Sequence, residues 1–286
     1  MAYSSLLIIL FAVVARASNH IYSKYALTRI DSISLYLVTN IVCALAVFPF
    51  IIKDLPSFFS MPTVFMLAVV GAGIFQPVTG ILSNYALQKT PVGIYTTINQ
   101  LQLVWVILGS TLLLSERITW NAGIGISMII LASLLVSDID TRKTVGMKVI
   151  LLVVASSFAA AVAIMIDRLL IVHTSSLLYF FFMITIPTLL FVPHIMKKRN
   201  DYAIKIKKHW IVGLVASVCF GATYYGLLLL YTLPDVPLSI SYSIRNTSNI
   251  FAVALAIFIF GENKNVPRKL LAVVIAVIGA AFTQFA

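Results

Sequence analysis

Long apolar blocks separated by short charged connections make up almost the whole of this 286-residue chain. Their apolar residues are not confined to the single stripe that a soluble amphipathic helix shows. The pattern predicts ten helices, at residues 4–25, 32–52, 62–87, 92–115, 119–137, 145–170, 175–196, 209–232, 236–260 and 266–285. Helices that are apolar all round and about 20 residues long fit a lipid bilayer. We therefore expect an all-α integral membrane protein with ten transmembrane helices.

Prolines and charged residues mark the ends of the blocks. Pro91 and Pro237 open predicted helices, where the missing amide hydrogen costs nothing. Pro187 lies inside a block and is predicted to kink it. The connections are short apart from residues 197–209, so we expect a bundle of neighbouring helices with little chain outside the membrane.

Composition agrees with a membrane protein and excludes nucleic-acid binding. The chain is 61% hydrophobic and only 10% charged, whereas soluble domains are about a quarter charged. The net charge of +11 comes from cations in the short connections, where they anchor topology. No basic face with interleaved aromatic residues is left to hold a phosphate backbone. We expect this chain to be surrounded by membrane lipid and not to bind nucleic acid.

A weak internal repeat relates the two halves of the chain. A shift of 146 residues superposes similar residues, in the pairs Pro91 and Pro237, Ile94 and Ile240, Thr97 and Ser243, Ile98 and Ile244, and Glu116 and Glu262. Each matched segment is a helix that begins at a proline, ends at a glutamate and precedes one more helix. Five helices per half is an odd number, so the second half must cross the membrane in the opposite sense. The sequence thus predicts inverted repeats at 1–140 and 141–286, with a ligand site between them.

Two short motifs close the fourth and ninth predicted helices, and each precedes a final apolar helix. They are Leu113-Leu114-Ser115-Glu116-Arg117 and Phe260-Gly261-Glu262. With the ten-helix layout, they resemble the EamA-type transporters of the drug/metabolite transporter superfamily. Residues 15–19 depart from the family, because they read Ala-Arg-Ala-Ser-Asn where many members carry Trp-Gly-Ser-Asn. The fourth helix also lacks the mid-helix proline that is common in the family. Both departures fall in the expected cavity, so the family's substrates cannot be carried over to this chain.

Two arginines, Arg16 and Arg245, lie near the middle of predicted helices. An ionisable group at this depth costs about 2.5–3.5 kcal/mol and normally faces a cavity or the bundle interior. Polar residues share the faces of these helices, and of the third and fourth helices, at helical spacing. We therefore predict one substrate-binding cavity, lined by Arg16, Asn19, His20, Gln76, Tyr95, Asn99, Gln102, Tyr242, Arg245, Asn246 and Asn249.

Acidic residues are absent from the middle of the predicted helices, and Asp167, near the end of the sixth, is the closest one. A cavity arginine without an acidic partner indicates an anionic group on the ligand. The same absence disfavours a proton-coupled exporter of lipophilic cations, which needs a membrane-embedded carboxylate. His20 can be a proton carrier or a plain hydrogen-bonding residue. Tyr224 and Tyr225 can stack on a substrate or simply pack between helices.

These observations predict a secondary transporter that moves a small metabolite, an amino acid or an organic acid, by alternating access. Two alternatives stay open: an exporter of neutral or cationic metabolites, with the arginines paired to Asp167 and helix-end carbonyls, and a non-transporting receptor or scaffold. The sequence has no nucleophile elbow, phosphate-binding loop, zinc-protease motif or acidic cluster. We therefore expect no enzymatic activity, no cofactor and no metal, and a monomer or homodimer in the cell membrane.

The positive charges predict an orientation. Of the 20 lysines and arginines, 15 lie in the connections after the odd-numbered helices and 3 in the opposite set. By the positive-inside rule the rich set is cytoplasmic and both termini lie outside. The family resemblance implies the reverse, with both termini in the cytoplasm, and the sequence leaves the two orientations open.

Overall fold

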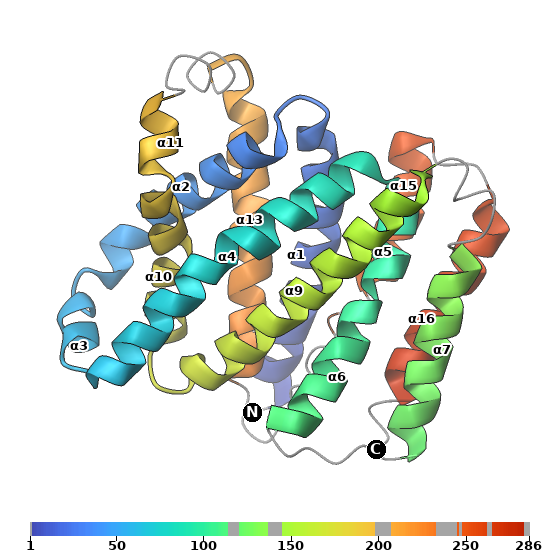
Figure 1. Ribbon diagram of the computed structural model, residues 1–286, viewed down its shortest axis with the longest axis horizontal. Coiled ribbons are helices and arrows are strands. Elements are labelled where there is room, and N and C mark those ends of the chain that lie inside the picture. The colour runs from blue at the N-terminus through green and yellow to red at the C-terminus, as the bar shows by residue number, and fades with distance from the viewer. Residues whose placement is uncertain are drawn as a thin grey trace.

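The computed structural model describes residues 2–113, 120–136, 145–197, 207–232, 245, 248–261 and 265–282, and these are helices and short connections with no strand among them. The first half contributes α1 (Ala2–Leu27), α2 (Ser32–Ile51), α3 (Leu55–Phe59), α4 (Thr63–Lys89), α5 (Val92–Asn99), α6 (Leu101–Leu113) and α7 (Trp120–Val136). The second half contributes α9 (Met147–Ile171), α10 (Ser176–Leu190), α11 (Val192–Lys197), α13 (Trp210–Tyr231), α15 (Ser248–Phe260) and α16 (Val266–Phe282). The long helices run back and forth across the molecule (Figure 1).

The fourth predicted helix, 92–115, is interrupted at Gln100, which the sequence pattern did not indicate. The amide of Gln100 donates to the carbonyl of Thr97 at 3.2 Å, a bond one residue shorter than the α-helical one. Just before the break, the hydroxyl of Thr97 donates back to the carbonyl of Gly93 at 2.8 Å. Threonine hydroxyls that bond back in this way compete with the backbone and bend helices. The predicted single helix is therefore two segments, α5 and α6.

The predicted helix 175–196 is also divided, into α10 and α11, and a short helix, α3, lies in a predicted connection. Phe191 ends α10, with its amide bonded to the carbonyls of Pro187 and Thr188. Pro193 has no amide hydrogen, so it cannot continue the bonding of α10, and it suits the first turn of α11. Pro56 plays the same part near the start of α3. The ninth predicted helix, 236–260, is described from Ser248 onward as α15.

The contacts between the two halves are reciprocal: a contact of one helix of the first half with a helix of the second half has a counterpart between the equivalent helices. The first long helix of one half packs on the third of the other, as α1 on α13 and α4 on α9. The second packs on the third in the same reciprocal way, as α2 on α13 and α10 on α4. Equivalent helices also meet, α2 with α10 and α7 with α16, and Figure 1 shows α4 beside α9 and α7 beside α16. The halves therefore contact each other through equivalent surfaces, as an approximate twofold relation requires.

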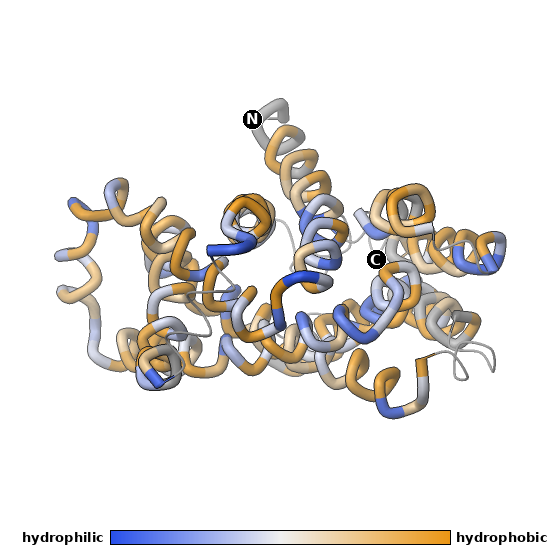
Figure 2. Tube along the Cα trace, turned by 90° about the horizontal axis from the view of Figure 1, so that it is seen from above, coloured by the Kyte–Doolittle hydropathy of each residue, from blue (hydrophilic) through white to orange (hydrophobic). Residues whose placement is uncertain are grey.

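Apolar side chains cover the outside of the bundle and polar ones face inward. On α4, Leu67 and Val78 are 66% and 52% exposed, while Gln76 and Thr79 face an internal cavity. Figure 2 shows hydrophobic residues along most of the helices and hydrophilic ones in short stretches. This reversal of the soluble pattern is what a lipid surrounding requires.

Five described segments are long and apolar enough to cross a bilayer: Ser32–Ile51, Thr63–Lys89, Val92–Leu112, Met147–Ile171 and Trp210–Tyr231. Shorter apolar helices such as α10 accompany them. Five such segments in one chain mean that it passes through the membrane several times. The expectation of a helical, multi-pass membrane protein is thereby confirmed.

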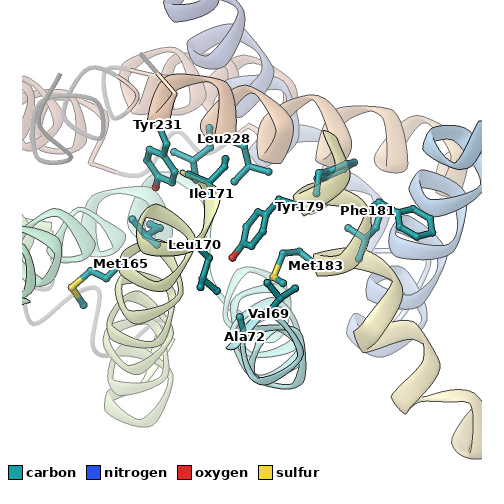
Figure 3. Close-up of a cluster of buried hydrophobic side chains, with 14 of the residues drawn as sticks. Val69, Ala72, Met165, Leu170, Ile171, Tyr179, Phe181, Met183, Leu228 and Tyr231 are labelled. Carbon is teal, nitrogen blue, oxygen red and sulfur yellow. The ribbon is translucent and has the colours of Figure 1, made fainter. Parts of the chain in front are cut away.

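The largest apolar cluster lies where α9, α10 and α13 meet α4. Figure 3 shows Tyr179 of α10 among Leu170 and Ile171 of α9, Met183 of α10 and Leu228 of α13. Tyr179 is fully buried, so its hydroxyl needs a partner inside the protein. That partner belongs to the cavity described next.

Candidate functional site

A cavity of about 210 Å³ lies between the two halves. Its lining comes from α1, α2, α4, α5, α6, α9, α10 and α13, and from Arg245. Most of the lining residues are polar or charged: Arg16, Asn19, His20, Ser23, Tyr36, Thr39, Asn40, Gln76, Thr79, Ser83, Asn84, Tyr95, Asn99, Gln102, Asp167, Thr223, Tyr224 and Arg245. A cavity with many polar residues, between helices with apolar outer faces, is a setting in which membrane proteins hold ligands.

Eight of the eleven residues predicted from the sequence line this cavity: Arg16, Asn19, His20, Gln76, Tyr95, Asn99, Gln102 and Arg245. Asn249 is buried in α15 and does not line it. Tyr242 and Asn246 lie outside the described residues. The structure thus brings together the polar faces of the helices expected to meet, because α1, α4 and α5 each turn one face toward the cavity.

Three basic groups gather on one side of the cavity. Arg16 and Arg245 are only 4% and 7% exposed, and both interact electrostatically with His20. The ring of His20 meets Tyr95 edge-on, with the centroids 5.9 Å apart. Next to it on α1, the hydroxyl of Ser23 donates to the side-chain oxygen of Asn19 at 3.0 Å. This wall offers a concentration of positive charge and N–H donors from both halves of the chain.

The break between α5 and α6 also faces the cavity. The side chains of Asn99 and Gln102, on either side of Gln100, both line it and share a hydrogen bond of 3.3 Å. Discontinuous helices in transporters commonly place polar groups and freed backbone at a ligand site. The helix interruption at Gln100, which the sequence did not reveal, therefore lies between two residues that line the candidate ligand site.

The expectation of an interior without carboxylates is wrong. Asp167 is only 3% exposed and lines the cavity from α9. Its two carboxylate oxygens accept hydrogen bonds from the hydroxyls of Tyr179, at 2.8 Å, and Tyr224, at 3.1 Å. α9 ends at Ile171, so Asp167 lies a full turn inside the helix, close to where the predicted helix 145–170 placed it. The absence of an embedded carboxylate, which disfavoured a proton-coupled or cation-transporting protein, therefore no longer holds.

Other lining residues were missed or assigned to structure alone. Tyr36, Thr39 and Asn40 line the cavity from α2 at i, i+3, i+4 spacing, a pattern that could have identified them. Asn40 also donates to the carbonyl of Tyr36 at 2.7 Å, so it serves the helix as well. Tyr224 lines the cavity, whereas Tyr225 packs on the ring of Phe180 and does not.

A hydrogen-bonded cluster ties helix ends together beside the cavity residues Ser23 and Leu87. The Lys24 ammonium, one turn before the end of α1, donates to three carbonyls at the end of α4: Leu87 at 2.8 Å, Gln88 at 3.1 Å and Thr90 at 2.7 Å. Gln88 then accepts from Ser32, the first residue of α2, at 3.0 Å and donates to the carbonyl of Leu27 at 3.1 Å. We call this set the Lys24 cluster. It joins α1, α2 and α4 at one end of the bundle.

The EamA-like transporter family matches the chain twice, over residues 3–138 and 147–285. One solved structure, described only as the crystal structure of a protein, superposes with a TM-score of 0.67 over 99% of this chain and 97% of its own, at 14% identity. At that identity the likeness shows a shared fold and nothing about the ligand. A search of curated proteins found no match.

Proposed function

Because the chain belongs to the EamA-like transporter family, we propose that it is a secondary transporter for a small metabolite with a carboxylate or another anionic group. The family resemblance seen in the sequence is thereby confirmed, and it indicates a membrane transporter of the drug/metabolite type. Members of this family are transporters rather than enzymes. Within that class, an amino acid or an organic acid is the cargo that the cavity favours.

The charge of the cavity wall carries this proposal. Among the described residues, the charged side chains of the lining are Arg16, Arg245 and Asp167, a net charge of +1. Both arginines are buried, and each guanidinium offers several fixed N–H donors that suit a carboxylate. A low-dielectric site with net positive charge favours an anionic group over a neutral one.

The proposed mechanism is alternating access between two inverted five-helix repeats, 1–140 and 141–286, that together cross the membrane ten times. The reciprocal contacts between the halves support it, because equivalent interfaces can exchange roles when one half rocks against the other. Arg16 belongs to the first half and Arg245 to the second, so the ligand would be held between the moving parts. The Lys24 cluster lies wholly within the first half, so it would hold α1, α2 and α4 together as that half moves.

Substitution of Arg245 tests the proposal in proteoliposomes. Loss of a charge-assisted hydrogen bond costs about 1.5–3 kcal/mol, so Arg245→Gln should weaken uptake of the carboxylate substrate about 10- to 150-fold. Arg29→Ala is the matched control, because Arg29 is exposed and lies 3.9 Å from the centre of the Tyr25 ring. Unchanged uptake by a stable Arg245→Gln protein would refute the assignment. If the wild-type protein binds the carboxylate but gives no flux, a receptor or scaffold would be favoured.

A second candidate function is supported by Asp167, whose buried carboxylate suits a cationic ligand. On this alternative the cargo is a neutral or cationic metabolite and no anion is bound. A thermal-shift screen of charged metabolites separates the two candidates, because a ligand stabilises the form that binds it. Stabilisation by amines without a carboxylate would favour the alternative, and stabilisation by carboxylates the main proposal.

For orientation in the cell membrane, we propose that both termini lie outside, as the excess of cations in one set of connections indicates. The family pattern implies the opposite side. In Figure 1, α1 begins and α16 ends at the same end of the bundle, so one reporter answers for both. A C-terminal fusion to an enzyme active only in the cytoplasm should give no signal, and a signal would overturn the charge-based orientation.

A further inference from the structure

Asp167 of α9 lies at the centre of a hydrogen-bond chain that connects four helices. Tyr179 of α10 donates to one carboxylate oxygen and Tyr224 of α13 to the other. The hydroxyl of Tyr224 in turn accepts from the amide nitrogen of Gln76 in α4, at 2.7 Å. The amide oxygen of Gln76 accepts from the hydroxyl of Thr79 at 2.9 Å. Every donor in this chain is directed toward the carboxylate, which is therefore held in one orientation as an acceptor.

The carboxylate retains acceptor capacity on the cavity side. Two carboxylate oxygens have about four lone-pair sites, and the tyrosines occupy one on each oxygen. No lysine or arginine among the described residues pairs with Asp167. Its neighbour Arg168 donates instead to the backbone carbonyl of Tyr231. Neutral tyrosine hydroxyls do not cancel a full negative charge, so a buried carboxylate here favours a cation from the cavity.

The cavity therefore has two poles. One wall holds Arg16 and Arg245, both of which interact electrostatically with His20 in the lining. The other holds Asp167, whose interactions are with tyrosines and not with those arginines. A ligand with a single negative charge would leave Asp167 facing an apolar or neutral part of the molecule. That arrangement is costly for a buried charge.

We propose that Asp167, oriented by Tyr179 and Tyr224, binds a protonated amine on the same molecule whose anionic group is held at Arg16 and Arg245. This inference rests on the proposed function and deepens it, because it makes the cargo a zwitterion. A primary ammonium offers three donors and suits the open edge of one carboxylate. A metal ion would require several oxygen, nitrogen or sulfur ligands, and no group of three His, Cys, Asp or Glu residues lies among the described residues.

Four probes with the same six-carbon chain test the proposal: hexanoate, hexylamine, 2-aminohexanoate and 6-aminohexanoate. Binding is measured by calorimetric titration of the full-length protein in nanodiscs. At least one of the two amino acids should bind about tenfold or more tightly than hexanoate, as expected for one added charge-assisted hydrogen bond. If neither amino acid binds better than hexanoate, the proposal is overturned without recourse to any variant.

Substitutions then locate the effect. Asp167→Asn should reduce the amino-acid preference to within about threefold, and hexanoate should bind at least as tightly as to the wild type, because a negative charge is removed from the cavity. Asp54→Asn, the same change at an exposed position, should alter neither. Tyr224→Phe should lower the preference, and Tyr225→Phe, at the neighbouring tyrosine outside the lining, should not. A preference that survives Asp167→Asn would overturn the assignment. Hexanoate affinity and its loss in Arg245→Gln report separately on the proposed function, and if no probe binds the wild type both proposals fail.

Discussion

Lys24 should contribute more to stability than Lys89, the exposed lysine that ends α4. Its ammonium donates to three carbonyls in and after the last turn of α4. Carbonyls at the end of a helix have no partner within the helix and also carry the negative end of its dipole. In Lys24→Met the apolar stem is largely retained, while the charge and all three hydrogen bonds are lost.

The expected loss follows from those bonds. A hydrogen bond to a charged group contributes about 1.5–3 kcal/mol net. The three bonds share one ammonium and its desolvation, so they do not add fully. We expect Lys24→Met to lower the free energy of unfolding by about 2–4 kcal/mol. Lys89→Met is the matched control, because Lys89 ends the same helix, is exposed, and lies 5.7 Å from the centre of the Tyr85 ring. Such an exposed contact is worth about 0.5–1 kcal/mol.

Two measurements check the prediction. Unfolding in mixed micelles with increasing dodecyl sulfate gives the change in stability. Labelling of a cysteine at Ser23, in a protein without Cys43 and Cys219, reports whether that end of the cavity opens; these two are the only cysteines in the chain. Lys24→Met should raise the labelling rate at least about tenfold, since loss of the cluster lets α1 separate locally from α2 and α4 beside Ser23. Equal effects of Lys24→Met and Lys89→Met would refute the reasoning.

Two further predictions concern the helices around the cavity. A Cβ at Gly73 would lie 2.7 Å from the Cβ of Ile186 in α10, so Gly73→Ala should lower the free energy of unfolding by about 1–3 kcal/mol. A Cβ at Gly71 would meet nothing within 4 Å. Gly71→Ala should therefore be neutral or stabilising by up to about 1 kcal/mol. Asp31 caps α2 by accepting from the amide of Ser34 at 3.0 Å, so Asp31→Ala should cost about 1 kcal/mol. The same micelle titration measures both, and equal stabilities of the two glycine variants would contradict the close approach of α4 and α10.

Features set by local sequence could be predicted well. Asp31 followed by an apolar run marks the start of α2, and the structure shows the cap. The polar face of α1, from Arg16 to Ser23, is fixed by helical spacing alone and does line the cavity. Such features depend on residues within one or two turns of each other. A single sequence contains all the information that they need.

Features set by distant partners could not be predicted. Lys24 reaches carbonyls more than 60 positions away, and nothing in its own helix distinguishes it from a lysine that anchors a connection. The break at Gln100 is a different case, because the Thr97 bond to Gly93 is local, but the same threonines also fit an unbroken helix. For Lys24 the deciding contact is tertiary, and for Gln100 the local pattern allows both outcomes.

Asp167 shows that a position near a helix end does not tell whether a charged side chain faces the cavity. Next to Arg168 and near a predicted helix end, it looks like half of a solvated charge pair. Adjacent residues on a helix do not face each other. In α9, Arg168 donates to the Tyr231 carbonyl, whereas Asp167 lines the cavity. Its tyrosine partners come from two other helices, 12 and 57 positions away. A single carboxylate on an interior face therefore bears more on the choice of ligand than all the charges in the connections, because only the former must be balanced by the ligand.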